Sequence, residues 1–125
     1  MRARSGHIVL GPKIRYKDLE PLFRDLFALF LEESEQTRDD PEFFEIILEE
    51  NLRDLRNDRK PEGFNRDGIM RLVFPLSERK EFYLYGSSRS IEVPRVTQAL
   101  SQFLKQNKIR HEVEWDGLLR DEGKH

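Results

Sequence analysis

The chain has 125 residues, nine phenylalanines, no cysteine and a net charge of −2 at neutral pH, which suits one domain that buries a core without crosslinks. The lack of cysteine excludes disulfides, thiolate catalysis and cysteine-ligated zinc or iron–sulfur sites. No apolar run approaches the ~20 residues that span a bilayer, and no secretory signal follows the basic N-terminus, so we expect one cytoplasmic domain over residues 1–125, without cofactor or membrane contact.

Hydrophobic periodicity and turn residues predict seven elements in the order β-α-α-β-β-α-β. They are expected over residues 7–10 (strand), 18–36 (helix), 41–58 (helix), 69–74 (strand), 81–85 (strand), 94–106 (helix) and 109–115 (strand). Residues 1–6 are interpreted as a basic disordered arm and residues 116–125 as a tail. Residues 59–68 are interpreted as a loop because they are rich in residues that break helices and strands.

The predicted helix ends follow from residues that satisfy free backbone groups. Asp18 is expected to cap the first helix, with Pro21 in its first turn. Asp40 followed by Pro41 is a strong start signal for the second helix. Asn107 suits the left-handed residue that ends the third helix.

The apolar residues of the first helix cover an arc of roughly 200° on a helical wheel, although a helix on one surface needs little more than 100°. We therefore expect cover on two sides, by the sheet and by the second helix. Without the second helix the order is βαββαβ, the ferredoxin-like pattern. The predicted fold is therefore α+β: a ferredoxin-like antiparallel sheet with one added helix and one open face. If the short first strand is absent, a three-strand α+β meander with helices results.

Period two along the strands predicts which side chains lie on the open face of the sheet. They are His7, Val9, Arg71, Val73, Tyr83, Tyr85, Arg110, Glu112 and Glu114. The two tyrosines would lie mid-sheet near arginine, as in domains that stack RNA bases on a sheet. The glycines of that aromatic motif are absent, and the two glutamates would repel phosphate. Self-association through this face and simple exposure to solvent are the alternatives.

Acidic residues concentrate in one part of the chain. Residues 18–58 carry fourteen acidic and four basic side chains, whereas residues 1–17 carry no acidic side chain. The basic residues of this N-terminal part are Arg2, Arg4, Lys13, Arg15 and Lys17. Charge sorted in this way bears on partners and association rates rather than on fold.

The outer side of the second helix is the predicted partner-binding surface. Its residues are Glu42, Glu45, Ile46, Glu49 and Glu50. A branched aliphatic side chain within a ring of charge is typical of a small binding hot spot. The alternatives are that Ile46 is an isolated apolar surface residue, or that it contacts the loop 59–68 through Phe64.

Two further segments carry residues with chemical potential. The loop after the strand 81–85 offers hydroxyls, backbone amides and a guanidinium to a small anion, although turn chemistry alone explains its composition. Its candidate ligands are Ser87, Ser88, Arg89 and Ser90. His111, Glu112 and Glu114 are close in sequence, but on a strand the histidine points away from both glutamates, so no metal site is predicted. His111 is expected to be a structural histidine with one hydrogen bond.

No catalytic motif can be identified, so we expect a non-enzymatic protein-interaction module. It would bind a basic partner protein through the acidic helix and self-associate through the open sheet face. One alternative is an RNA- or single-stranded-DNA-binding domain that uses the sheet face and the basic N-terminal arm. The other is small-anion binding or an enzymatic role at residues 87–90.

Overall fold

The computed structural model describes residues 2–36, 40–66, 68–86 and 91–116. Its elements are β1 (Ser5–Leu10), the 3-10 turn η1 (Tyr16–Leu19), α1 (Glu20–Glu33), α2 (Pro41–Arg56), β2 (Gly63–Phe64), β3 (Arg71–Val73), β4 (Glu81–Tyr85), α3 (Glu92–Gln106) and β5 (His111–Asp116). The described part is therefore an α+β fold with three α-helices and five strands, and the α+β prediction is confirmed.

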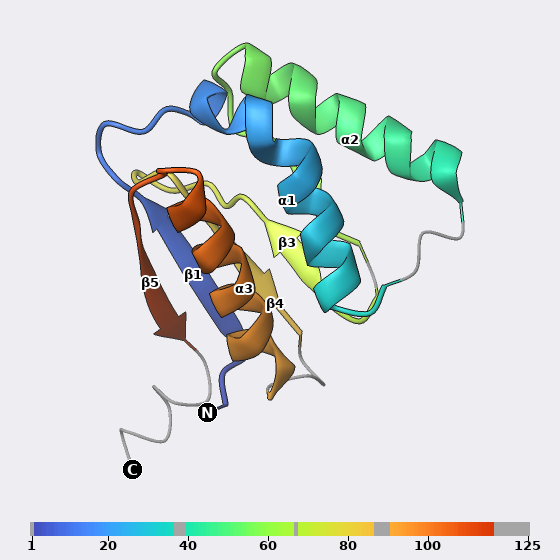
Figure 1. The fold of residues 1–125 in the computed structure, drawn as a ribbon, viewed down its shortest axis with the longest axis vertical. Coiled ribbons are helices and arrows are strands. Elements are labelled where there is room, and N and C mark those ends of the chain that lie inside the picture. Colours follow the sequence, from blue (N-terminus) through green and yellow to red (C-terminus); the bar gives the residue numbers. More distant parts are fainter. Residues whose placement is uncertain (1, 37–39, 67, 87–90, 117–125) are drawn as a thin grey trace.

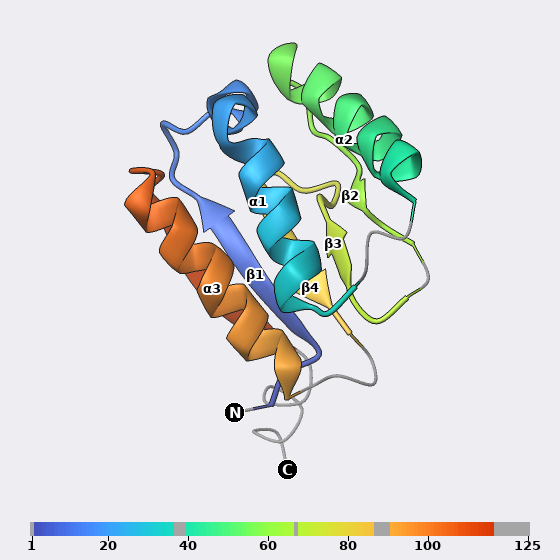
Figure 2. The same ribbon diagram turned by 45° about the vertical axis from the view of Figure 1, so that its right-hand side comes forward.

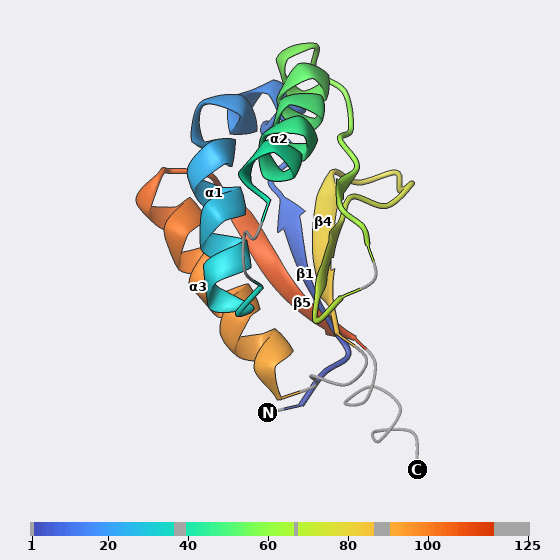
Figure 3. The ribbon, with the colours of Figure 1, turned by 90° about the vertical axis from the view of Figure 1, so that its right-hand side faces the viewer.

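The strands form one antiparallel sheet in the order β2-β3-β4-β1-β5. The short first strand is present and central, since β1 pairs with β4 on one side and with β5 on the other. The three helices lie on the same side of the sheet, and α1 lies between α3 and α2 (Figures 1 and 2). Viewed along its edge, the sheet leaves its other face without a helix (Figure 3).

Side chains alternate along the strands as predicted, and most of the helix-facing set is buried. Its buried members are Ile8, Leu10, Met70, Leu72, Phe74, Phe82, Leu84 and Ile109. Val113 and Trp115 of β5 were predicted for the same face, but they are only half-buried and line a hollow beside α3. Each large apolar side chain removed from water contributes roughly 1.5–3 kcal/mol, so this pattern fixes which face of the sheet the helices cover.

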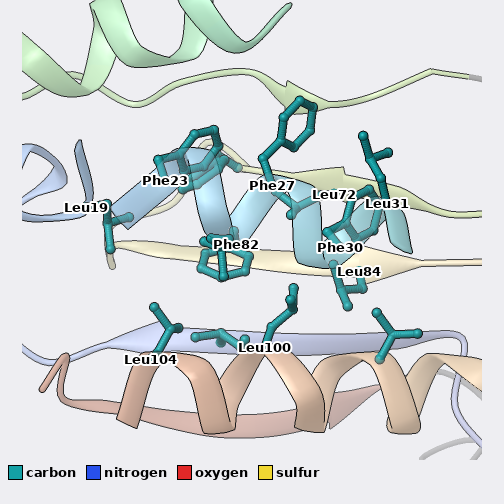
Figure 4. Close-up of a cluster of buried hydrophobic side chains, with 14 of the residues drawn as sticks. Leu19, Phe23, Phe27, Phe30, Leu31, Leu72, Phe82, Leu84, Leu100 and Leu104 are labelled. Atoms are coloured by element: carbon teal, nitrogen blue, oxygen red, sulfur yellow. The ribbon is translucent and has the colours of Figure 1, made fainter. Parts of the chain in front are cut away.

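The wide apolar arc of α1 is covered on several sides, which confirms the expected contact with α2. Phe23 and Phe27 stack with ring centroids 5.8 Å apart, and Phe27 stacks on Phe44 of α2 at 5.3 Å. Figure 4 shows Phe23, Phe27 and Phe30 of α1 in one buried cluster with Phe82 and Leu84 of β4 and with Leu100 and Leu104 of α3. α2 lies beside α1 in the helical layer (Figure 2), rather than above it.

The segment 59–68 contains a strand, β2, so its interpretation as a loop was wrong. Gly63 adopts a φ of 84°, a left-handed value that favours glycine, and its backbone pairs with Val73 of β3. The buried side chain of Asn51 holds it to α2. The Asn51 Oδ1 atom accepts from the Gly63 nitrogen at 2.7 Å, and Nδ2 donates to the Gly63 oxygen at 3.1 Å. The side chain of Asn51, 12 residues away, therefore holds this strand in place, and no local sequence pattern predicts it.

Some element ends differ from the prediction. The start of α2 is confirmed, since Asp40 accepts from the Phe43 nitrogen at 3.2 Å. Asp18 does not cap α1, because it lies in the preceding 3-10 turn and accepts from the Arg15 nitrogen at 2.8 Å. Asn107 is not the left-handed residue after α3; Lys108 is, with φ 62°.

The N-terminal arm was also predicted too long. Residues 5 and 6, assigned to the arm, begin β1 and pair with β4 and β5, and Ala3 is buried. Gly6 lets β1 lie close to α3, because a Cβ atom there would overlap Thr97 and lie 2.8 Å from the Trp115 ring. The hydroxyl of Thr97 is buried at this contact and has no hydrogen-bond partner within the described ranges.

We predict that Thr97→Val raises the free energy of unfolding by about 1 kcal/mol, because a methyl group of the same shape replaces a buried unpaired hydroxyl. Urea denaturation measures the change. Thr97→Ala is the control, since it also removes the hydroxyl but leaves a void and should be the less stable of the two variants. A Thr97→Val protein less stable than the parent would show that the hydroxyl has a partner.

Candidate functional site

The outer side of α2 carries the predicted partner-binding residues, and all of them are exposed. We call Glu42, Glu45, Ile46, Glu49 and Glu50 the acidic face. Ile46 is 55% exposed, and Phe43, three residues earlier, is 36% exposed. Residues three apart lie on one side of a helix, so these two form an apolar pair within the acidic face.

The glutamates of this face differ in their partners. Arg24 of α1 donates to both carboxylate oxygens of Glu45, at 2.9 and 3.3 Å, and its Nη2 atom lies 4.0 Å from Glu49. The hydrogen bond from Arg24 lowers the pKa of Glu45 below its usual range. Within the described residues, Glu42 and Glu50 take part in no ion pair. These two carboxylates are therefore the most available to a partner.

The apolar pair is bordered by a residue that sequence reasoning missed. The guanidinium of Arg66 lies over the Phe43 ring, 4.3 Å from its centroid, which is a cation–π distance. Phe64 instead packs edge-on against Phe27 and Phe30. The alternative in which Phe64 covers Ile46 is thus not supported. No sequence signal links Phe43 to Arg66, because the contact depends on how β2 returns past α2.

A cavity of about 140 Å³ lies beside this face, between α2 and the segment around β2. Its lining includes Ile47 and Phe64, and its charged residues are Glu50, Asp54, Glu62 and Arg66, three acidic and one basic. Asp54 is engaged by Arg59 at 3.2 Å. The cavity extends the negative character of the acidic face towards the β2 edge of the sheet.

The open face of the sheet carries Tyr83 next to His7, as period two predicted. Their rings stack with centroids 5.0 Å apart, so the histidine covers one face of the tyrosine. The Ser5 hydroxyl lies 3.1 Å from the His7 Nε2 atom. Tyr85 is 37% exposed and lies opposite Arg71 in the register of β3 and β4.

An ion-pair network that the sequence analysis did not anticipate crosses this face. Arg79 donates to Glu81 at 2.7 Å and to both oxygens of Glu114 at 3.0 Å. Glu81 is buried although it lies on the open face. The alternation that placed Tyr83 there could have placed Glu81 as well. Arg110 and Glu112, the other predicted members, are exposed.

His111 lies on the helix-facing side of β5, as predicted, but it makes two hydrogen bonds rather than one. Its Nδ1 atom is 2.8 Å from the Ile109 carbonyl oxygen and its Nε2 atom is 2.6 Å from the Ser101 hydroxyl. Because a carbonyl only accepts, Nδ1 carries a proton and the histidine joins β5 to α3. Among the residues that the structure describes, no cluster of three or more potential ligands could hold a metal ion.

The predicted anion-binding residues Ser87, Ser88, Arg89 and Ser90 lie outside the described residues, as do residues 117–125 of the predicted tail. The tail was predicted one residue too long, because Asp116 ends β5 and pairs with Ser5 of β1. Within the described ranges, no helix combines the length and apolar character needed to cross a bilayer. Comparisons with protein-family models, with curated proteins and with solved structures find no match.

We predict that Arg24→Gln raises the pKa of Glu45 towards its ordinary value of 4.5, because the hydrogen bond that favours the carboxylate is lost. Carbon-detected NMR titration of the glutamate carboxyl groups measures this. In the parent protein, the pair adds stability above the ordinary pKa and loses it as pH falls through the lowered pKa. Arg53→Gln removes an equal charge from α2 and serves as the control. An unchanged Glu45 pKa in Arg24→Gln would contradict the observed pairing.

Proposed function

We propose that this chain is a non-enzymatic interaction module that binds a partner protein through the acidic face of α2. The observation that carries the proposal is the apolar pair beside the carboxylates of α2: Ile46 is 55% exposed, and Phe43 is 36% exposed with Arg66 over its ring. A partner that covers this pair would remove its apolar surface from water, which favours binding. While it is exposed, the pair contributes nothing to the hydrophobic core. The pair is large enough to anchor a contact and too small to form a stable interface alone.

The partner would present basic side chains around an apolar pocket. Glu42 and Glu50 have no ion pair in the described part of the chain, so a partner's lysines or arginines need not displace an internal cation to reach them. Long-range attraction between opposite charges raises association rates, and added salt screens it.

For the fold itself, we infer a ferredoxin-like βαββαβ unit made of β1, α1, β3, β4, α3 and β5. The order β3-β4-β1-β5 within the sheet supports this, with α2 and β2 as additions at one side. Without α2, a unit of this type would leave the side of α1 that carries Phe27 exposed to solvent. The addition of α2 therefore both completes the core and supplies the proposed binding surface.

The open sheet face supports nucleic-acid binding less well. Glu81, Glu112 and Glu114 would lie near any bound phosphate, and His7 already covers one face of Tyr83. Self-association through this face remains part of the proposal, supported by the 37% exposure of Tyr85. The role proposed for residues 87–90 gains no support.

The proposal predicts that Ile46→Ser weakens partner binding by about 2 kcal/mol or more, about 30-fold, as expected for a hot-spot residue. Tagged full-length protein would capture partners from extracts of its native cells, and quantitative mass spectrometry would compare the bound amounts. The on-rate of the purified partner should fall as salt is added.

Leu76→Ser is the matched control, because Leu76 is 93% exposed but lies on the turn between β3 and β4. A partner lost equally from Leu76→Ser and Ile46→Ser would indicate non-specific adhesion. A partner retained by Ile46→Ser, or an on-rate insensitive to salt, would argue against the acidic face.

A further inference from the structure

Strand β5 forms one edge of the sheet, because β1 is its neighbour on one side and no other described strand pairs with it. It has six residues, His111–Asp116, three times the length of β2 at the opposite edge. Figure 1 shows β5 at the margin of the fold, next to α3. An edge strand of this length presents a row of backbone donors and acceptors to another chain.

The register shows which backbone groups face the free edge. The backbone nitrogen of Gly11 donates to the backbone oxygen of Arg110 at 2.8 Å. From this pair onwards, hydrogen-bonded and non-hydrogen-bonded pairs alternate along β1 and β5. In an antiparallel ladder, hydrogen-bonded pairs alternate with pairs whose groups point outwards. Arg110 and Glu112 therefore bond towards β1, and the backbone groups of His111 and Val113 point towards the free edge.

A groove follows this edge between β5 and α3. At its middle lies a hollow of about 300 Å³ whose lining includes Gln98, Gln102 and Lys105 of α3 as well as Val113. At the Arg110 end a wider hollow of about 710 Å³ also borders the end of β1, and its charged lining residues are Lys105, Lys108, Arg110 and Glu112.

These three cations are exposed and take part in no ion pair with any described residue. The groove is thus mixed polar and apolar in its middle, and at the end where β5 begins three cations outnumber the one carboxylate, that of Glu112. An occupant with a negative charge at that end would be favoured.

We propose that the free edge of β5 binds the extended C-terminus of a partner protein as an added antiparallel strand. In that orientation the partner's last residue lies at the start of β5, so the partner's terminal carboxylate lies near Lys105, Lys108 and Arg110. A parallel strand would bring its positively charged amino end to the same cations. Backbone pairing supplies the affinity in this mode, and side chains at alternate positions supply the selectivity.

A second copy of this chain fits the same edge poorly. In a two-fold antiparallel pairing centred on Val113, Glu112 of each copy would lie opposite Glu114 of the other. Like charges directly opposite one another destabilise a strand pair. This register is therefore disfavoured between two copies, whereas a strand with a different charge pattern would not meet the same repulsion.

The probe is the acetylated peptide Thr-Val-Thr-Val-Thr-Asp with a free C-terminal carboxylate, titrated into the full-length protein and followed by amide NMR shifts. The largest shifts should occur at His111 and Val113. Amidation of the peptide's C-terminus, or the double variant Lys105→Glu/Lys108→Glu, should each weaken binding by about tenfold. Lys105 and Lys108 are both exposed, so the double variant leaves the core intact. Ile46→Ser should have no effect, which separates this site from the acidic face.

Arg4→Glu is the matched control, because Arg4 is exposed and precedes Ser5, which pairs with Asp116 at the other end of β5. It should leave the affinity unchanged. A loss of peptide affinity in Arg4→Glu, and not in the double lysine variant, would mean that the peptide binds as a parallel strand and would overturn the proposal. So would an absence of shifts at millimolar peptide. Slow hydrogen exchange at His111 and Val113 in the free protein would show an edge already occupied, by its own chain or a second copy, and would also overturn it.

Discussion

Helix α1 cannot bury its apolar surface against the sheet alone. Its buried side chains, Phe23, Leu26, Phe27, Phe30 and Leu31, surround more of the helix than one flat layer can cover. The sheet, α3 and α2 each take a part of this surface, and the stacked rings of Phe27 and Phe44 join α1 to α2. Because large buried aromatic side chains dominate core energetics, the position of α2 follows from this requirement.

The same packing sets the character of the surface. The inner side of α2 is occupied by Leu48, Leu52 and Leu55, so its glutamates must face solvent. Asn51 extends the arrangement, since its amide binds both backbone groups of Gly63 and adds β2 to the sheet. A helix that completes the core thus also carries the acidic face and one wall of the neighbouring cavity.

Sequence reasoning predicted the α+β class, the three helices, four of the five strands and the helix-facing residues of those four strands. It succeeded where local periodicity is strong, as in α2 and β4. It failed where a contact distant in sequence decides whether a strand forms, as in β2. It also failed where backbone geometry decides which residue begins or ends a helix, as at Asp18 and Asn107. For the candidate site it located Ile46 and the four glutamates of the acidic face. It missed the exposure of Phe43, the position of Arg66 over that ring, and Arg79 between Glu81 and Glu114.

The sequence by itself determined which residues are apolar on one side of each element and how charge is divided along the chain, because both follow from covalent order and from the fixed periods of helix and strand. Only the tertiary structure decided which charges are already paired. Arg24 and Glu45 are 21 residues apart, and Arg79 and Glu114 are 35 apart, so their pairing depends on how the elements pack. Packing also decided that β5 lies at an edge, since strand order is set by the crossing connections between strands and cannot be derived from any one of them.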